Sequence, residues 1–440
     1  MLKQLRIQNF KGWEDTGTIR MAPISLFFGV NGSGKSSISQ FLMMLKQTME
    51  SPDRKAVFCP DPENKLAFEY RWALPKILKV RDPVTGRTFS GETLSFHAEV
   101  GLGGEDDRTL ILNQLEYDII DDCDSRLFIG MERKTDFRTD YKVDTTRYSL
   151  KRNKMRAWDP GAPVRFYGFP DEVVAYHQNA DFVQALNLGH EKLFRSICYL
   201  GPLRTKAERL YSWAGIEPES VGYAGEHTVA AIIAARSRKI SLGYKRPAKH
   251  FEEIIALKLK EMGLIEEFKV NPIFDRRQEY EVKVRTKRSK GWVDLLNAGA
   301  GVSQVLPVLV QCFYAPAGSI ILMEHPEIHL HPNAQSALAD VMIDVINSRE
   351  NGKDRGVQLI IETHSEYFLR RLQRRIAEDV VSQGKVAAYF ANIDRTPAKL
   401  ESLQIDIFGN IRNWPPNFFG DEMADIIGQA KASMKKAGLE

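Results

Sequence analysis

Cysteine is scarce in this chain, which has four cysteines among 440 residues and no C-x-x-C pair. This scarcity argues against a disulfide framework and against a zinc site built from paired thiolates. We expect reduced, mostly buried thiols and a cytoplasmic location. No apolar run approaches the length of a membrane span, and the opening MLKQLRIQNF alternates like a strand rather than a signal peptide, so no membrane partner is expected. The cysteines are Cys59, Cys123, Cys198 and Cys312.

An excess of one charge is also missing, because 61 lysines and arginines face 57 aspartates and glutamates, for a net charge of +4. This balance argues against a chain that binds polyanions through its overall charge. Sustained heptads are absent and proline and glycine recur, so a long coiled coil is not expected. With 43% hydrophobic residues the chain can build a substantial core, and its length predicts two to three domains or one domain with a large insertion.

A phosphate-binding loop is the most informative segment that is present. Residues 29–37 read GVNGSGKSS, which has every constrained position of the G-x-x-x-x-G-K-S motif. An apolar run before it predicts a buried strand, and helical spacing after it predicts a helix, so backbone N–H groups point at a phosphate. We expect ATP and Mg²⁺ as ligands, with Lys35 at the β- and γ-phosphates and the Ser36 hydroxyl on Mg²⁺. The residues expected to hold the nucleotide here are Asn31, Gly32, Ser33, Gly34, Lys35, Ser36 and Ser37.

Polar side chains follow two further apolar strands late in the chain. The strand over 319–323 ends at the sequence EHPE, residues 324–327, and a helix is predicted from Pro332 to about Asn347. The strand over 357–361 ends at ETHS, residues 362–365, and another helix follows. Strands that alternate with helices predict a parallel α/β sheet.

About 290 residues separate Lys35 from Glu324, far more than a compact nucleotide-binding core needs. The early part of this insertion has period-2 stretches typical of strands, and residues 171–262 have a more helical pattern. A hairpin is predicted near its end, with strands over 278–285 and 292–296 around the basic turn KRSK.

These motifs together resemble the ABC-type ATPase heads of the SMC, RecF and OLD lineage. Residues 5–37 are similar to the N-terminal lobe of such heads, MEHPEIHLHP to their Walker B and D-loop segment, and IIETHS to their switch-histidine segment. YLGPLR at 199–204 and IDIFGNIRNWPPNFF at 405–419 resemble a bacterial subfamily of AAA-family ATPases found in antiphage defence, such as the ATPase component of Septu- or PARIS-like systems.

The resemblance implies a P-loop NTPase head of ABC type, an α/β fold with a mixed or parallel sheet flanked by helices and an inserted subdomain that is β-rich and helical. We divide the chain into four predicted parts. They are an N-terminal ATPase lobe with a β-subdomain over 1–120, an inserted and mainly helical region over 121–265, a C-terminal ATPase lobe over 266–395, and a small C-terminal domain over 396–440.

The segment NAGAGVSQ at 297–304 lies just upstream of Walker B, where an ABC signature belongs. Its glycines open a predicted helix, which offers N–H donors and a helix dipole to a γ-phosphate. In such heads the signature of one subunit completes the site of another, so the resemblance implies a homodimer or a higher oligomer. The expected signature contacts are Gly299, Gly301, Ser303 and Gln304.

The Walker B segment departs from the usual Asp–Glu pair. Glu324 stands at the Asp position, where it can hold Mg²⁺ together with Ser36, and His325 stands at the position of the catalytic Glu. An unperturbed histidine is largely neutral at pH 7 and can polarise water, or it can sense the γ-phosphate. His364 is the expected switch histidine. We therefore name Glu324, His325 and His364 as catalytic candidates, with hydrolysis expected to be slow.

Several nearby residues carry weaker predictions. Glu327 and Glu362 are carboxylates that can share the catalytic role, although a structural role is favoured for Glu327. The H-x-H of His329 and His331 is interpreted as D-loop and helix entry, because no cysteine or carboxylate is spaced to complete a metal site. Three residues near the N-terminus lie where related heads contact adenine or ribose, and one of them, Phe10, is equally compatible with the core. These are Phe10, Lys11 and Trp13.

Three functions fit these features. The first is an ATP-driven oligomeric switch that controls a separate effector, a nuclease or toxin, in antiphage defence. The second is a repair or recombination ATPase that binds DNA directly, for which the basic stretches 147–156 and 285–290 are candidates. The third, a nuclease of OLD type, is disfavoured because only 76 residues follow His364, too few for a fused Toprim domain.

Overall fold

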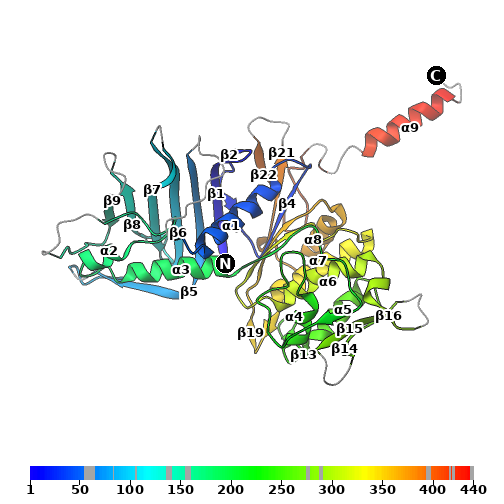
Figure 1. Ribbon diagram of the computed structural model, residues 1–440. Helices are drawn as coiled ribbons and strands as arrows, with labels where there is room; N and C mark the ends of the chain where they lie inside the picture. Colours follow the sequence, from blue (N-terminus) through cyan, green and yellow to red (C-terminus); the bar gives the residue numbers. More distant parts are fainter. Residues whose placement is uncertain are drawn as a thin grey trace.

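The structure is a computed structural model of the 440-residue chain. It describes residues 1–53, 65–82, 84–104, 107–134, 141–153, 160–273, 278–286, 291–392, 398–415, 418 and 422–436. Among these residues, no helix has the length and apolar character that crossing a bilayer requires. Two sheets and the helices packed around them organise the molecule (Figure 1).

A six-stranded sheet carries the nucleotide motifs. Five neighbouring strands are parallel and the last pairs in the antiparallel sense. The strand that precedes the phosphate loop lies inside this sheet, because it is apolar and buried along its whole length. The order is β10 (Ile197–Leu200), β17 (Ile320–Glu324), β20 (Gln358–Glu362), β4 (Ile24–Gly29), β21 (Val386–Asn392) and β22 (Lys399–Ser402).

A large antiparallel sheet lies beside it, on the left in Figure 1. Its strands alternate buried and exposed residues, as expected for a sheet with one face in a core. The eight strands are β1 (Leu2–Phe10), β2 (Trp13–Asp15), β3 (Ile19–Arg20), β5 (Leu66–Arg81), β6 (Thr88–Gly104), β7 (Asp107–Ile120), β8 (Arg126–Arg133) and β9 (Tyr141–Thr146).

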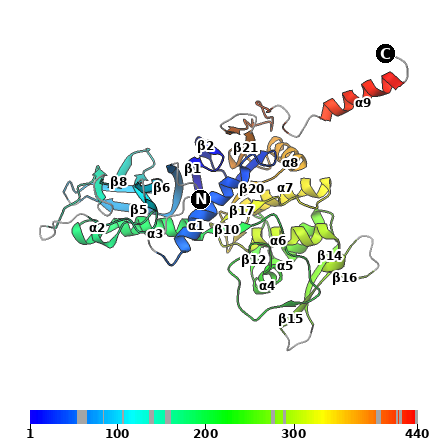
Figure 2. The same cartoon turned by 45° about the horizontal axis from the view of Figure 1, so that its top comes forward.

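The helices cover both faces of the six-stranded sheet, and α9 stands apart from the rest of the chain (Figures 1 and 2). The longest described helices, α1 and α7, have 16 residues each, so the described part of the chain contains no long coiled coil. The α-helices are α1 (Lys35–Glu50), α2 (Asp171–Tyr176), α3 (Phe182–Arg195), α4 (Thr228–Ala234), α5 (Phe251–Glu261), α6 (Ala300–Tyr314), α7 (Pro332–Asn347), α8 (Glu366–Ala377) and α9 (Glu422–Lys436). Two 3₁₀ helices are η1 (Leu295–Asn297) and η2 (Gln383–Lys385).

Two smaller four-stranded sheets complete the described fold. One contains the predicted hairpin, whose strands β15 and β16 pair in the antiparallel sense. Its members are β11 (Tyr211–Ser212), β14 (Glu267–Pro272), β15 (Glu279–Arg285) and β16 (Val293–Asp294). The other contains β12 (Lys239–Ser241), β13 (Ala248–His250), β18 (Arg349–Glu350) and β19 (Lys353–Asp354).

Alternation along the parallel strands places side chains in two separate hydrophobic cores. In β4, Leu26 and Phe28 belong to the core shared with α6, α7 and α8, whereas Phe27 between them belongs to the core shared with α1, α3 and the antiparallel sheet. Ile321 and Leu322 of β17 divide in the same way. The six-stranded sheet is therefore the common wall of both cores.

The expected fold class is confirmed, an α/β fold with a phosphate loop between a buried strand and a helix and with an inserted β-rich subdomain. The region over 121–265 contains more strands than the helical expectation allows, and these include parts of both large sheets. Strands β8 and β9 extend the antiparallel sheet, and β10 pairs with β17 as an edge of the six-stranded sheet. A strand of four residues is too short to be separated by periodicity from its helical surroundings.

Candidate functional site

The phosphate loop connects β4 to α1 through backbone geometry that requires glycine. A Cβ atom on Gly29 would lie 2.6 Å from the Ala391 carbonyl oxygen, and Gly29 has φ +145°. A Cβ on Gly34 (φ +84°) would lie 2.9 Å from Trp13 Nε1. That indole nitrogen donates a hydrogen bond to the Gly34 carbonyl at 3.0 Å, so Trp13 helps to fix the backbone of the loop.

Lys35 is buried at the start of α1, and its Nζ donates to the Val30 carbonyl at 2.8 Å. Burial lowers the pKa of Lys35, and the carboxylate of Glu362, 3.9 Å away, partly opposes that shift. The Ser33 hydroxyl is buried and has no hydrogen-bond partner among the described residues. A cationic amine and an unpaired hydroxyl beside a glycine turn match what a bound phosphate requires.

Glu362, at the end of β20, is the carboxylate in contact with this loop. The Ser36 hydroxyl donates to Glu362 Oε1 at 2.9 Å, while Glu362 Oε2 is buried without a partner. Burial raises the pKa of Glu362, since the charged form is desolvated there, and the neighbouring Glu324 adds to that rise. The sequence predicted Glu324 beside Ser36, but the structure places Glu362, the register partner of Glu324 on the adjacent strand, in contact with Ser36.

His325 lies between two carboxylates. Its Nδ1 is 3.6 Å from Glu327 Oε1 and its Nε2 is 3.7 Å from Glu362 Oε1. Its ring stacks on that of His364 at 4.9 Å with 7° between the planes. His364 also donates its backbone N–H to Glu327 Oε1 at 2.9 Å. The site thus combines the ends of β17 and β20, as expected where parallel strands end at one edge of a sheet.

The pKa values of His325 and His364 are shifted in opposite directions. Glu327 raises the pKa of His325, burial opposes that rise, and Glu362 reinforces it. Burial lowers the pKa of His364 to about 4, helped by the positive charges of Lys35 and His325. Glu327 is desolvated, yet its bonds to His325 and to the His364 backbone outweigh that effect and lower the pKa of its carboxyl. The expectation that His325 has an unperturbed pKa is therefore corrected, because two acidic neighbours favour its charged form.

Two residues of the YLGPLR segment hold the Walker B segment, a role that sequence reasoning missed. Tyr199 on β10 donates its hydroxyl to Glu324 Oε1 at 2.7 Å. Arg204 is buried and donates to the carbonyls of Glu324 at 2.8 Å and His325 at 3.0 Å. Burial lowers the pKa of Arg204 to about 10. The signal in the sequence was YLGPLR at 199–204, which indicated a family resemblance but not a contact with residues 324 and 325.

The backbone of His325 adopts φ +47°, a conformation that a histidine adopts only when its surroundings enforce it. Its N–H donates to the Glu362 carbonyl at 2.8 Å and its carbonyl accepts from Arg204. Both backbone groups are thus fixed, which directs the imidazole toward Glu327 and Glu362.

The predicted signature residues sit at the N-terminal end of α6. Gly299 precedes the helix with φ +96°, and a Cβ on Gly301 would lie 3.2 Å from the His329 carbonyl oxygen in the D-loop. The Ser303 hydroxyl donates to the Ala300 carbonyl at 3.1 Å. An open pocket of about 420 Å³ lies here, lined by residues of the signature, the D-loop and the 202–207 segment, among them Gly299, Ser303, Gln304 and His329.

The remaining candidates have separate positions. His331 caps α7 by accepting from the Asn333 N–H at 3.3 Å, in line with the helix-entry interpretation. Phe10 is 1% exposed and packs edge-on against Phe41, so it is a core residue, whereas Lys11 is exposed. Residues 154–156 and 287–290 of the two basic stretches lie outside the described residues, as does Cys59.

ATP and Mg²⁺ fit the arrangement on three observations: the glycine cradle that a Cβ would fill, the orphaned Ser33 hydroxyl, and the Ser36–Glu362 pair with one free carboxylate oxygen. Hydroxyl and carboxylate oxygens are ligands that Mg²⁺ prefers. Lys35, Ser36 and Glu362 are thus the residues best placed to hold the phosphates and the ion.

Comparisons with known proteins agree with this geometry. A family model described as "AAA domain, putative AbiEii toxin, Type IV TA system" matches residues 123–370, one described as "AAA ATPase domain" matches residues 1–81, and one described as "Protein of unknown function (DUF3696)" matches residues 381–427. Among curated proteins, none matches the chain.

Solved structures with a weaker likeness are SMC heads. The SMC head domain from Thermotoga maritima is 9% identical with a TM-score of 0.40, covering 92% of this chain and 99% of that one. An SMC head bound to the C-terminal winged-helix domain of ScpA is 11% identical with a TM-score of 0.42, covering 92% and 98%. An SMC head from Pyrococcus furiosus with an extended coiled coil, bound to the C-terminal domain of ScpA, is 10% identical with a TM-score of 0.39, covering 98% and 99%.

The match over residues 123–370 includes the segments predicted to be Walker B and the signature, together with His364, and it spans more than half of the sequence. The chain belongs to the AAA-domain family of that description.

Proposed function

We propose that this protein is an ATP-binding and slowly ATP-hydrolysing switch that works as a homodimer or higher oligomer and controls a separate effector, such as a nuclease or toxin, in bacterial antiphage defence. The observation that carries the ATPase part is the convergence of Lys35, Ser36, Glu362 and His325 at one edge of the parallel sheet. The toxin–antitoxin description of the matched family supports the defence part.

The chain's own groups divide the chemistry. Lys35 holds negative charge at the phosphates, and Ser36 with Glu362 and Glu324 positions the metal side of the site. Mg²⁺ held there by Ser36, Glu362 and Glu324 would neutralise negative charge that develops on the phosphates. Water is oriented by the stacked pair of His325 and His364.

We expect slow turnover because His325, which stands at the position of the usual catalytic glutamate, is unsuited to act as the base. Its raised pKa keeps the imidazole protonated to higher pH, and a protonated imidazole cannot accept a proton from water. Glu362 has a raised pKa, which makes it a better base than an ordinary carboxylate. We therefore assign the role of general base to Glu362, and a phosphate-sensing role to His325.

In the proposed oligomer, the predicted signature of one subunit completes the nucleotide site of another. Gly299, Gly301 and Ser303 lie at a helix N-terminus beside an open pocket, where N–H groups suit a phosphate that another subunit brings. The alternative function, a DNA-binding repair ATPase, depends on basic stretches that lie partly outside the described residues. The two functions differ in one measurable respect, since only the second predicts turnover stimulated by duplex DNA.

One experiment tests the proposal directly. Purified protein is assayed for ATP turnover and for mass by light scattering, with and without ATP, duplex DNA or the product of the adjacent gene. We expect ATP-dependent assembly, turnover at or below about 1 s⁻¹, the low end of ordinary enzymes, and a response to the neighbouring gene product. A monomer with ATP, or stimulation by DNA alone, would contradict the switch.

A further inference from the structure

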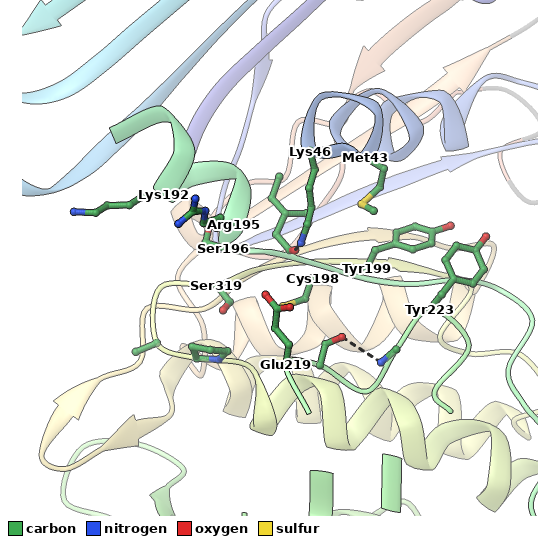
Figure 3. A pocket seen from close by; sticks show the side chains of 15 residues that line it. Met43, Lys46, Lys192, Arg195, Ser196, Cys198, Tyr199, Glu219, Tyr223 and Ser319 are labelled. Atoms are coloured by element: carbon green, nitrogen blue, oxygen red, sulfur yellow. Dashed lines mark hydrogen bonds between the residues drawn. The ribbon is translucent and has the colours of Figure 1, made fainter. Parts of the chain in front are cut away.

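A second cavity, apart from the phosphate loop, lies between α1, the end of α3, β10 and the loop over 219–223 (Figure 3). Its volume of about 410 Å³ is in the range of small-molecule sites.

The cavity has a cationic end and an aromatic end. Figure 3 shows Lys192 and Arg195 on one side and Tyr199 and Tyr223 on the other. The two tyrosine rings lie 5.0 Å apart and are tilted, so they form one continuous aromatic wall. Figure 3 shows the Met43 side chain, which comes from α1, next to that wall.

The charge of the lining favours an anion. The residues that line the cavity include three cations, Lys46, Lys192 and Arg195, and a single carboxylate, Glu219. Lys46 donates to the Ile197 carbonyl at 2.6 Å and lies 3.6 Å from Glu50. The Arg195 side chain is 67% exposed. It makes one long contact, 3.5 Å, with Glu191, which leaves most of the five guanidinium N–H donors available to a ligand.

The cavity also borders three parts of the ATPase. Lys46 is on α1, the helix that begins with Lys35. The loop over 219–223 is tied to α6, because Gln311 accepts from the Val221 N–H at 3.1 Å. Tyr199, whose ring lines the aromatic end, donates its hydroxyl to Glu324 at 2.7 Å. A ligand that moves this ring changes the hydrogen bonding of the Walker B carboxylate.

We propose that this cavity is a regulatory site for a nucleoside monophosphate, with the phosphate at Lys192 and Arg195 and the base against Tyr199 and Tyr223, and that Tyr199 transmits its occupancy to Glu324. A planar ring and an anionic group at opposite ends describe this class of molecule. The coupling to turnover rests on the proposed ATPase function, whereas the binding does not.

Binding is tested with AMP and inorganic phosphate on the Lys35→Ala protein, whose phosphate loop has lost its cation. Calorimetry should show AMP binding, with inorganic phosphate weaker because it lacks a base. Adding Arg195→Glu should weaken AMP by about tenfold or more, since one charge-assisted contact becomes repulsive. Arg374→Glu is the matched control, because Arg374 is 62% exposed and pairs with Glu378 at the same i, i+4 spacing that joins Arg195 to Glu191.

Absence of AMP binding to Lys35→Ala would overturn the proposal, as would equal binding by the Arg195 and Arg374 variants or equal affinities for AMP and phosphate. Coupling is measured at saturating ATP, where AMP should change turnover by about fivefold, a typical allosteric factor. Arg195→Glu should abolish the response with the phosphate loop intact, and a persistent response would place AMP at the ATP site instead. Tyr199→Phe should bind AMP but not respond, and a normal response would overturn the role of Tyr199.

Discussion

The Ser36 hydroxyl donates to Glu362 at 2.9 Å, so the carboxylate in contact with the phosphate loop belongs to β20, the strand that ends just before His364. Glu324, its register partner on β17, is bonded to Tyr199 instead. The acidic roles at this site are therefore divided between two strands, and the two carboxylates should respond differently to substitution.

Replacing Glu362 with glutamine should lower ATP turnover by about 10²-fold or more, because both a metal-side oxygen and the proposed base are lost. Nucleotide binding should change little, since Lys35 and the glycine cradle remain. The comparison is Glu324→Gln, which should raise the Mg²⁺ requirement more than it lowers turnover at saturating Mg²⁺. Turnover assays across a magnesium titration distinguish the two, and an active Glu362→Gln protein would remove Glu362 as the base.

Replacing Lys35 with alanine should abolish ATP binding by calorimetry, because it removes the buried cation that points into the loop. Lys353→Ala, an exposed lysine on β19, is the control and should bind ATP normally. Retention of wild-type affinity by Lys35→Ala would refute the assignment of the phosphate loop.

The sign of the pH dependence separates two roles for His325. Its pKa is raised above 6.5, so the imidazolium is fully present below pH 6.5 and is lost as the pH rises through the raised pKa. If the cation senses phosphate, turnover measured from pH 6 to 9 should fall as His325 deprotonates, and His325→Gln should lose this decline. A rise in wild-type turnover that His325→Gln abolishes would show that neutral His325 is itself the base, whereas a rise that persists in the variant would come from Glu362.

His364 predicts the opposite sign for stability. Its pKa is lowered to about 4, so the unfolded chain binds more protons than the native protein between that value and about 6.5. His364 therefore contributes stability above pH 6.5 that is lost as pH falls toward 4. Urea unfolding of the wild type and His364→Asn should show a shallower loss in the variant, and identical pH slopes would contradict the lowered pKa of this imidazole.

Replacing Ser303 with glutamate should leave nucleotide binding intact but prevent ATP-dependent assembly, because a carboxylate would meet the γ-phosphate across the interface. Ser433→Glu on the exposed helix α9 is the control. Mixing Ser303→Glu with Lys35→Ala should restore part of the activity, since one composite site keeps both functional halves. Light scattering that shows normal assembly of Ser303→Glu would refute the shared site.

Arg204→Met should lower the free energy of unfolding by about 2 to 4 kcal/mol, because two buried backbone carbonyls lose their donors. It should also reduce turnover in the protein that remains folded, since His325 loses the contact that fixes its backbone. Arg355→Met is the control, because Arg355 is also buried and donates to the carbonyls of Cys312 and Phe313 near the end of α6, away from the site. Similar destabilisation with normal turnover is expected for the control.

Much of the site could be predicted because its signals are local. The phosphate loop, the strand ends at Glu324 and Glu362, and the entry to α7 at His331 are each written within a few residues. The partners of Glu324 could not be predicted in this way. Tyr199 and Arg204 lie more than 100 residues earlier, and only the pairing of β10 with β17 brings them to the site.

The same limit explains the misplaced part of the fold. β10 has four residues, and its sequence ICYL gives no periodicity that separates it from the helix before it. Its partner in the sheet is β17, so its identity as a strand depends on pairing across the whole insertion. The raised pKa of His325 has its main cause close by in the sequence, in Glu327, and only the smaller contribution of Glu362 depends on the neighbouring strand.

The six-stranded sheet separates two hydrophobic cores, and each of its inner strands gives alternate side chains to both. A cavity in one core, for example one opened by Phe68→Ala among the aromatic rings of the antiparallel sheet, therefore weakens the packing of β4 through Phe27, which lies in the same core. The chain should consequently melt as one thermodynamic unit despite its length, and saturation with ATP should protect the distant strands β7 and β8 from hydrogen exchange as well as the phosphate loop.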